Sequence, residues 1–190
     1  MAQPGRSLRA DAARNRARVL EVAYEVFATE GLSVALDEIA RRAGVGPGTV
    51  HRHFPAKDDL VRAVVEERLQ RLIAEGRALH DDGDPGTALF DFMRSMVLTR
   101  GAADRGLSFA LAGMGTSVRG VVPEAETDFL DMVDDLLTAA QRAGTVRPDI
   151  GARDVKTLLV GCQAMHASDV AAAPRLLDVM FAGMRAPTRD

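Results

Sequence analysis

The sequence has few of the residues that stabilise small secreted proteins or that span membranes. Cys162 is the one cysteine among 190 residues, so no disulfide can form within the chain and we expect a cytoplasmic location. There is no tryptophan and only 4% of the residues are aromatic, so Leu, Val, Ala and Met must fill most of the core. No apolar run reaches the roughly 18 residues of a membrane helix, and the arginine-rich start lacks the apolar core of a signal peptide. We therefore expect no membrane partner.

Positive charge is concentrated near the N-terminus. The net charge is −3 at pH 7, which argues against a general binder of nucleic acid. Residues 1–57, however, hold nine basic and six acidic side chains, whereas the remaining residues hold fifteen basic and twenty-one acidic ones. This distribution predicts that only the N-terminal segment meets a polyanion.

Hydrophobic residues recur at helical spacing along most of the chain, and no segment has the alternation of a strand. Between Val19 and Phe27 they fall at i, i+3, i+4, i+7 and i+8, which is one face of a helix. Glycine and proline breakers predict further helices over about 36–43, 47–54, 56–79, 85–100, 103–112, 123–143, 155–167 and 174–184. Residues 1–10 lack this periodicity and are expected to form a flexible arm. The predicted fold class is all-α.

The stretch VGPGTVHRHFPAKDDL, residues 45–60, gathers two histidines, an arginine and a lysine. His51 and His53 are two apart, so on a helix they point roughly 200° away from each other and cannot share a metal ion. No cysteine lies nearby to complete a zinc pattern. A catalytic histidine pair meets the same geometric objection, and no local nucleophile is present. We expect no metal, no cofactor and no catalytic residue here.

A helix-turn-helix explains more of the same stretch. LDEIARRA and PGTVHRHF are short helices joined by the turn GVG. Val50 and Phe54, four apart, are expected to face inward and fix the second helix to its domain. The slim N-terminus of that helix, at Pro47 and Gly48, would let its backbone approach DNA in the major groove.

These residues resemble the DNA-binding signature of the tetracycline-repressor (TetR) family. The second helix and its flanks carry the pattern Gly44-Val45-x-x-Gly48-Thr49-Val50-x-x-His53-Phe54-x-x-Lys57-x-x-Leu60. Upstream, the family spacing continues in Val22-Ala23-x-x-Val26-Phe27-x-x-x-Gly31 and Asp37-x-Ile39-Ala40-x-x-Ala43-Gly44. The resemblance covers about residues 14–60, and the remainder is similar only in its plan of helices. It implies an N-terminal helix-turn-helix domain, residues 11–57, joined by a long helix to a C-terminal helical bundle, residues 58–190.

The resemblance also implies which side chains meet double-stranded DNA. Thr49 and Lys57 match positions that usually contact phosphates, and His53 matches the common His before Phe. His51 stands where the family often has Tyr, so a base contact, a phosphate contact and no contact all stay open. Ala35 stands where the family often has Thr, and Ser33 is a candidate replacement. The full set of predicted DNA-binding residues is Arg41, Arg42, Pro47, Gly48, Thr49, His51, Arg52, His53 and Lys57.

The arginines of the N-terminal segment have two interpretations each. Arg52 suits a guanine contact, because arginine is the commonest specific reader of that base. Arg41 and Arg42 are either phosphate contacts or solvated surface. Those in the first sixteen residues either reach the minor groove or begin a helix: Arg6, Arg9, Arg14 and Arg16.

Family members are homodimeric regulators, usually repressors that a small molecule releases from DNA. Apolar side chains spread over the C-terminal helices, with one histidine, are either plain core or the lining of an effector pocket: Phe90, Met93, Phe109, Met114, Met132, Met165 and His166. Cys162 and His166 share a helix face, but a packed thiol explains the cysteine better than a nucleophile does. The resemblance places the dimer interface on about residues 152–169 and 174–186, where small residues such as Gly161, Ala164 and Ala167 allow close packing.

Two alternatives to a ligand-responsive repressor stay open. The first is a DNA-binding regulator without a small-molecule effector, controlled by a protein partner, which a solid C-terminal core would favour. The second is a helical-bundle enzyme. The sequence offers no paired-carboxylate or Glu-x-x-His pattern for a bundle metal site, and the acidic Asp131, Asp134 and Asp135 are explained by a solvated face. We therefore expect no enzymatic activity.

Overall fold

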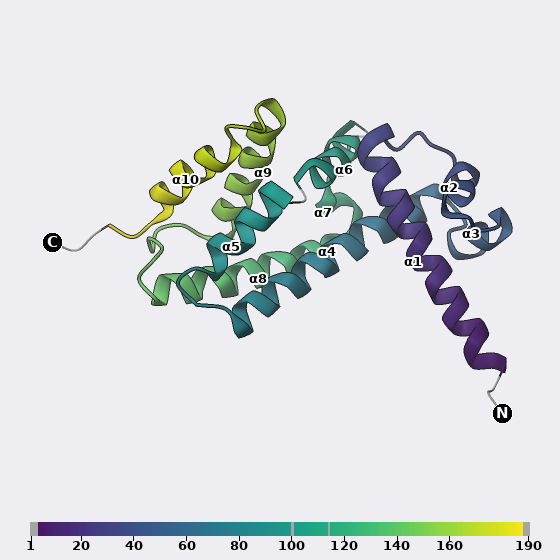
Figure 1. Ribbon diagram of the computed structural model, residues 1–190, viewed down its shortest axis with the longest axis horizontal. Helices are drawn as coiled ribbons and strands as arrows, with labels where there is room; N and C mark the ends of the chain where they lie inside the picture. Colours follow the sequence, from purple (N-terminus) through teal and green to yellow (C-terminus); the bar gives the residue numbers. More distant parts are fainter. Residues whose placement is uncertain (1–3, 100, 114, 188–190) are drawn as a thin grey trace. The chain divides into compact units, whose positions relative to one another are not determined.

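The computed structural model describes residues 4–99, 101–113 and 115–187, and these ranges fold almost entirely into helices (Figure 1). In chain order they are α1 (Pro4–Glu30), α2 (Leu36–Ala43), α3 (Pro47–His53), α4 (Lys57–Asp82), α5 (Ala88–Arg94), the π-helix η1 (Ser95–Thr99), α6 (Gly101–Gly113), α7 (Val118–Val121), α8 (Pro123–Arg142), α9 (Ala152–Ser168) and α10 (Ala173–Met184). Within the described ranges, extended backbone pairs only at an isolated bridge between Val146 and Arg185. The predicted all-α class is confirmed.

The largest differences between the helices and the sequence-based prediction lie in three places. α1 begins at Pro4, inside the segment predicted to be a flexible arm. Arginine and alanine are strong helix formers, so this segment can be helical without a hydrophobic face to reveal it. Gly101 begins α6 instead of ending the preceding helix, which closes as a π-helix over Ser95–Thr99. The glycine-rich segment after α6 contains the short helix α7.

The chain divides into two compact units. The first comprises Met1–Glu67 with Gly106–Val122, and the second comprises Arg68–Arg105 with Pro123–Asp190. The sequence predicts a different division, between residues 57 and 58, which separates a DNA-binding part from an effector-binding and dimerisation part. That functional division stays a prediction. The structure adds that residues 106–122, far along the chain, cluster with the N-terminal helices.

The first unit is held by the apolar faces of α1, α2 and α3, which contact one another (Figure 1). Phe27, Ile39 and Val50 contribute fully buried side chains to this core. α6 approaches α1 closely: a Cβ on Gly106 would lie 2.1 Å from the carbonyl oxygen of Ala28. Only glycine fits at that position without displacing backbone.

The second unit is a helical bundle in which α5 and α9 each contact η1 and α8. Leu89, Phe92 and Leu136 are among its fully buried side chains. Its interior also contains an ion pair between Arg68 and Asp104, whose side chains are both about nine-tenths buried. Arg68 donates two hydrogen bonds of 2.5 Å to the carboxylate of Asp104. Pairing satisfies both groups, which would otherwise be costly to bury.

Candidate nucleic-acid interface

The turn between α2 and α3 has the geometry of a helix-turn-helix. Gly44 adopts the left-handed conformation, with φ of 65°, and ends α2. The backbone N–H of Val45 then donates to the carbonyl of Ala40 at 3.0 Å, which closes the helix end. α3 begins at once with Pro47, whose missing N–H costs nothing at a first helical position. Gly46 is the residue immediately before α3.

α3 presents one apolar and one polar face. Val50 is 1% exposed and Phe54 is 3% exposed, so both face the interior as predicted. His51, Arg52 and His53 are exposed, and Thr49 is half-buried. The seven-residue helix therefore points its polar side chains outward from a fixed apolar base.

Phe54 at the end of α3 makes one contact with α1 and one with its neighbour His53. The guanidinium of Arg16 lies 5.7 Å from the ring centroid of Phe54, which is a cation–π contact between α1 and the end of α3. The ring of His53 lies 6.2 Å from that of Phe54 in a tilted arrangement. Of the two interpretations of Arg16, the structure supports the helical one, with the side chain stacked on the core of its own unit.

The polar side chains of α3 differ in whether they already bind other residues of the chain. The Nε2 atom of His51 lies 2.8 Å from Oδ1 of Asp37 in the first turn of α2. In the part of the chain that the structure describes, Arg52 has no hydrogen-bond or ion-pair partner, and it is exposed. Its guanidinium is therefore available to a ligand outside the chain, whereas His51 is already bound.

Arg41 and Arg42 are held in a carboxylate network at the end of α2. Arg41 donates to both carboxylate oxygens of Glu38, at 2.8 and 2.7 Å, and Arg42 donates to Glu38 at 2.7 Å and to Glu30. The hydrogen bonds from Arg41 and Arg42 lower the pKa of Glu38 to about 2. Much of the positive charge of this pair is balanced within the chain. The spacing of three and four residues from Glu38 is the signal in the sequence that could have predicted this part of the network.

The remaining predicted DNA-binding residues lie at the two ends of α3. Pro47 and Gly48 are exposed at its N-terminus, and a Cβ on Gly48 would meet nothing within 4 Å. Lys57 is the first residue of α4 and is half-buried, and burial lowers the pKa of its amine. Together with α3 these residues share the first unit, so the structure brings the predicted nucleic-acid set into one body.

The residues predicted to line an effector pocket are less uniform. Phe90, Met93 and Met132 are buried in the second unit, where the ring of Phe90 packs edge-on against Phe181 at 5.0 Å. His166 is half-buried, and its Nδ1 atom is buried without a hydrogen-bond partner. Met165, in contrast, is 38% exposed on α9. Phe109 belongs to α6 in the first unit but its side chain is not among those described, and Met114 lies outside the described residues.

α9 and α10 carry an exposed apolar surface. Val160 is 58% exposed on α9 and Val179 is 63% exposed on α10, and the two helices contact each other. A Cβ on Gly161 or on Gly183 would meet nothing within 4 Å, so the surface is open at both glycines. Exposed large aliphatic side chains next to small residues are typical of an interface with another chain.

Comparison with known proteins identifies the chain's relatives. The family model of the tetR family of bacterial regulatory proteins matches residues 19–64. A family model described as the C-terminal domain of SbtR-like transcriptional regulators matches residues 84–186, more than half of the chain. This chain belongs to the TetR family. It is a DNA-binding transcriptional regulator rather than an enzyme.

Similar solved and curated proteins agree with this assignment. A TetR regulator from Mycobacterium vanbaalenii is 52% identical, with a TM-score of 0.76 over 94% of this chain and 99% of that one. SCO0520 from Streptomyces coelicolor is 31% identical, with a TM-score of 0.73 over 91% and 99% of the two chains. The HTH-type transcriptional regulator SAB2452 of Staphylococcus aureus is 37% identical over 76 residues, which are 40% of this chain and 41% of that curated relative.

Two further properties of the TetR-family chain concern membranes and metals. Across the described residues, no helix is long and apolar enough to cross a bilayer. The same residues contain no cluster of three or more histidine, cysteine or acidic side chains that could hold a metal ion.

Proposed function

We propose that this TetR-family regulator is a dimeric, cytoplasmic repressor that binds a palindromic operator and leaves it when a small molecule binds. The outward polar face of α3 carries this proposal. Arg52 is exposed there, with no partner among the described residues, on a helix fixed by Val50 and Phe54. A rigidly held helix with an available guanidinium suits direct contact with base edges in the major groove.

The DNA-binding residues have graded roles in this proposal. Arg52 reads a base, most simply guanine O6 and N7. Thr49, His53, Lys57 and the exposed N-terminus of α3 at Pro47 and Gly48 approach the phosphates. Arg41 and Arg42 contribute less, because Glu38 and Glu30 already balance their charge. His51 contributes least, because Asp37 occupies its Nε2 atom.

Dimerisation through α9 and α10 supplies a second helix-turn-helix domain, which binds the other half-site of the operator. The exposed Val160, Met165 and Val179 offer the apolar area that such an interface needs, and small neighbours such as Gly161 and Gly183 permit close helix packing. A twofold pair of helix-turn-helix domains reads two half-sites related by the same symmetry, which is why the operator should be palindromic.

Release by a small molecule requires a ligand with different affinities for the DNA-bound and free shapes. Phe90, Met93 and Met132 are buried apolar side chains of the second unit, and the Nδ1 atom of His166 in the same unit is buried without a hydrogen-bond partner among the described residues. Side chains of these kinds suit a mostly apolar guest with one hydrogen-bonding group. A ligand that enters among these residues must replace some of their buried contacts. In this proposal, that replacement changes how the helices of the bundle pack.

The decisive experiment selects bound duplexes from random DNA with the purified full-length protein. A twofold-symmetric consensus, bound by two protomers, is expected. A screen of small molecules against that duplex, read by fluorescence anisotropy, then tests release. Selection of no consensus, or of an unsymmetrical site bound by one protomer, would refute the dimeric repressor. Tight operator binding that no molecule in a broad screen relieves would instead favour control by a protein partner.

A further inference from the structure

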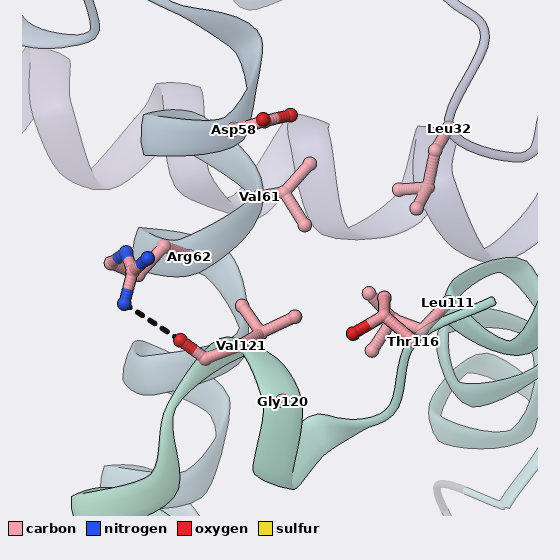
Figure 2. A pocket seen from close by; sticks show the side chains of 8 residues that line it. All are labelled: Leu32, Asp58, Val61, Arg62, Leu111, Thr116, Gly120 and Val121. Atoms are coloured by element: carbon pink, nitrogen blue, oxygen red, sulfur yellow. Dashed lines mark hydrogen bonds between the residues drawn. The ribbon is translucent and has the colours of Figure 1, made fainter. Parts of the chain in front are cut away.

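A cavity of about 260 Å³ lies within the first unit, separate from the predicted DNA-contacting residues and from the predicted effector set. Its walls come from the segment that follows the α1 C-terminus, from the first turns of α4, and from the α6–α7 segment (Figure 2). All the lining residues belong to one compact unit. The cavity is therefore a feature of that unit alone.

The cavity has an apolar wall. Leu32, Val61 and Leu111 are buried, and Val121 is half-buried beside them. Figure 2 shows the side chains of Leu32, Val61 and Leu111 directed toward a common space, with Thr116 at its edge. A small apolar body placed there would be removed from water on several sides, which is the main source of affinity in such sites.

Arg62 closes one side of the cavity and is already engaged. Its Nη1 atom donates a 2.7 Å hydrogen bond to the carbonyl oxygen of Val121. Figure 2 shows the guanidinium turned toward that carbonyl and away from the space between Val61 and Leu32. Arg62 therefore links α4 to α7 through this hydrogen bond.

Asp58 supplies an acidic group at the rim of the cavity. It lines the cavity from the first turn of α4 and is exposed, and among the described residues it makes no hydrogen bond, although the charge of the adjacent Lys57 interacts with it. A carboxylate that makes no hydrogen bond at the rim of an apolar space can accept one from a ligand with a cationic donor, and charge-assisted hydrogen bonds are about twice as strong as neutral ones.

We propose that this cavity binds a small amphipathic amine, with its ammonium group on Asp58 and its apolar body against Leu32, Val61 and Leu111. This site is additional to the effector site proposed for the second unit. Leu32 lies between α1 and α2, and Asp58 lies in the first turn of the helix that follows α3. An occupant would thus touch the segments that flank the helix-turn-helix on both sides.

The test uses the full-length protein without DNA, so its failure leaves the repressor proposal standing. Three probes share one apolar body: 2-phenylethylamine, 2-phenylethanol and 3-phenylpropionate. Titration calorimetry is expected to rank the amine about tenfold above the alcohol, with the carboxylate weakest. Amide chemical shifts should move at Leu32, Gly120 and Val121 on addition of the amine. No binding of any probe, or shifts confined to other residues, would overturn the site.

A matched pair of variants tests the role of the carboxylate. Asp58→Asn keeps the size of the side chain and should bring the amine's affinity down to that of the alcohol. Asp131→Asn removes the same charge from an exposed position on α8, away from the cavity lining, and should leave the ranking unchanged. If Asp58→Asn retains the tenfold preference, or if Asp131→Asn abolishes it, the assignment of the ammonium to Asp58 is wrong.

Discussion

The Nε2 atom of His51 lies 2.8 Å from Oδ1 of Asp37, so this side chain ties α3 to the first turn of α2. Any contact of that nitrogen with DNA would compete with Asp37. Its neighbour Arg52 carries no such restraint among the described residues. The two adjacent residues should therefore affect operator binding very differently.

Replacing Arg52 with alanine is expected to weaken binding to the selected operator by about 1–3 kcal/mol and to relax the preference at one base position. His51→Ala should cost less and leave the base preference intact. Anisotropy titrations against the operator and each of its single-base variants would measure both effects. A larger loss for His51→Ala than for Arg52→Ala would reverse our assignment of the two side chains.

Lys57→Ala tests a contact of a different kind. A phosphate contact is blind to sequence, so its loss should weaken binding to operator and random duplex alike. The slope of log K against log salt should become shallower by about one. Arg77→Ala, which removes an exposed positive charge from α4 in the second unit, is the control and should leave the slope unaltered. An unchanged slope for Lys57→Ala would place Lys57 away from the phosphates.

Local signals in the sequence predicted most of the helix-turn-helix. Gly44 and Pro47 mark the turn, and the spacing of Val50 and Phe54 predicts which face is inward. Contacts between distant residues were not predictable in the same way. The pairs His51–Asp37 and Arg42–Glu30 join residues 14 and 12 apart in the sequence, across a turn whose path decides whether they meet.

The same limit applies to the cavity and to α1. Asp58 looks like an ordinary first-turn carboxylate until Thr116 and Val121 are folded beside α4. The first residues of α1 lack a hydrophobic face, so periodicity had nothing to detect, and helix propensity alone indicates the longer helix. The exposure of Val160 and Val179 was likewise invisible, because buried and interface valines look alike in a sequence.

Glu38 should make the stability of the helix-turn-helix domain decrease at low pH. The pKa of its carboxyl in the folded state is lowered from 4.5 to about 2 by hydrogen bonds from Arg41 and Arg42. The stabilisation is thus complete above pH 4.5 and is lost as the pH falls toward 2. Melting temperatures measured across this window should converge for the wild type and Glu38→Gln as the pH falls. Glu66→Gln, at an exposed position of α4, should show no such convergence. A constant gap between wild type and Glu38→Gln would contradict the network.

Val160→Glu and Val179→Glu should each convert the proposed dimer into a monomer. Both positions are exposed in the single chain, so a charge there should change its own unfolding free energy by less than about 0.5 kcal/mol. Buried in a twofold interface, each charge would meet its own copy and lose its hydration. Sedimentation would report the mass, with Ala78→Glu on the exposed side of α4 as the control. If both variants remain dimers, the dimer interface does not lie on α9 and α10.

Gly106→Ala and Gly113→Ala, both on α6, should have opposite effects on stability. Helix propensity alone favours alanine over glycine by up to about 1 kcal/mol. At Gly106, however, the new Cβ would lie 2.1 Å from the carbonyl oxygen of Ala28 and 2.8 Å from its carbonyl carbon. Those are backbone atoms, which cannot rotate away as a side chain does, so the strain of about 1–3 kcal/mol should exceed the gain. At Gly113 a Cβ meets nothing within 4 Å, and the substitution should be neutral or slightly stabilising. Urea unfolding midpoints would separate the two variants. Equal or higher stability for Gly106→Ala would mean that α6 can move away from α1 at little cost in free energy. The close approach of the two helices at this glycine would then not contribute to the stability of the first unit.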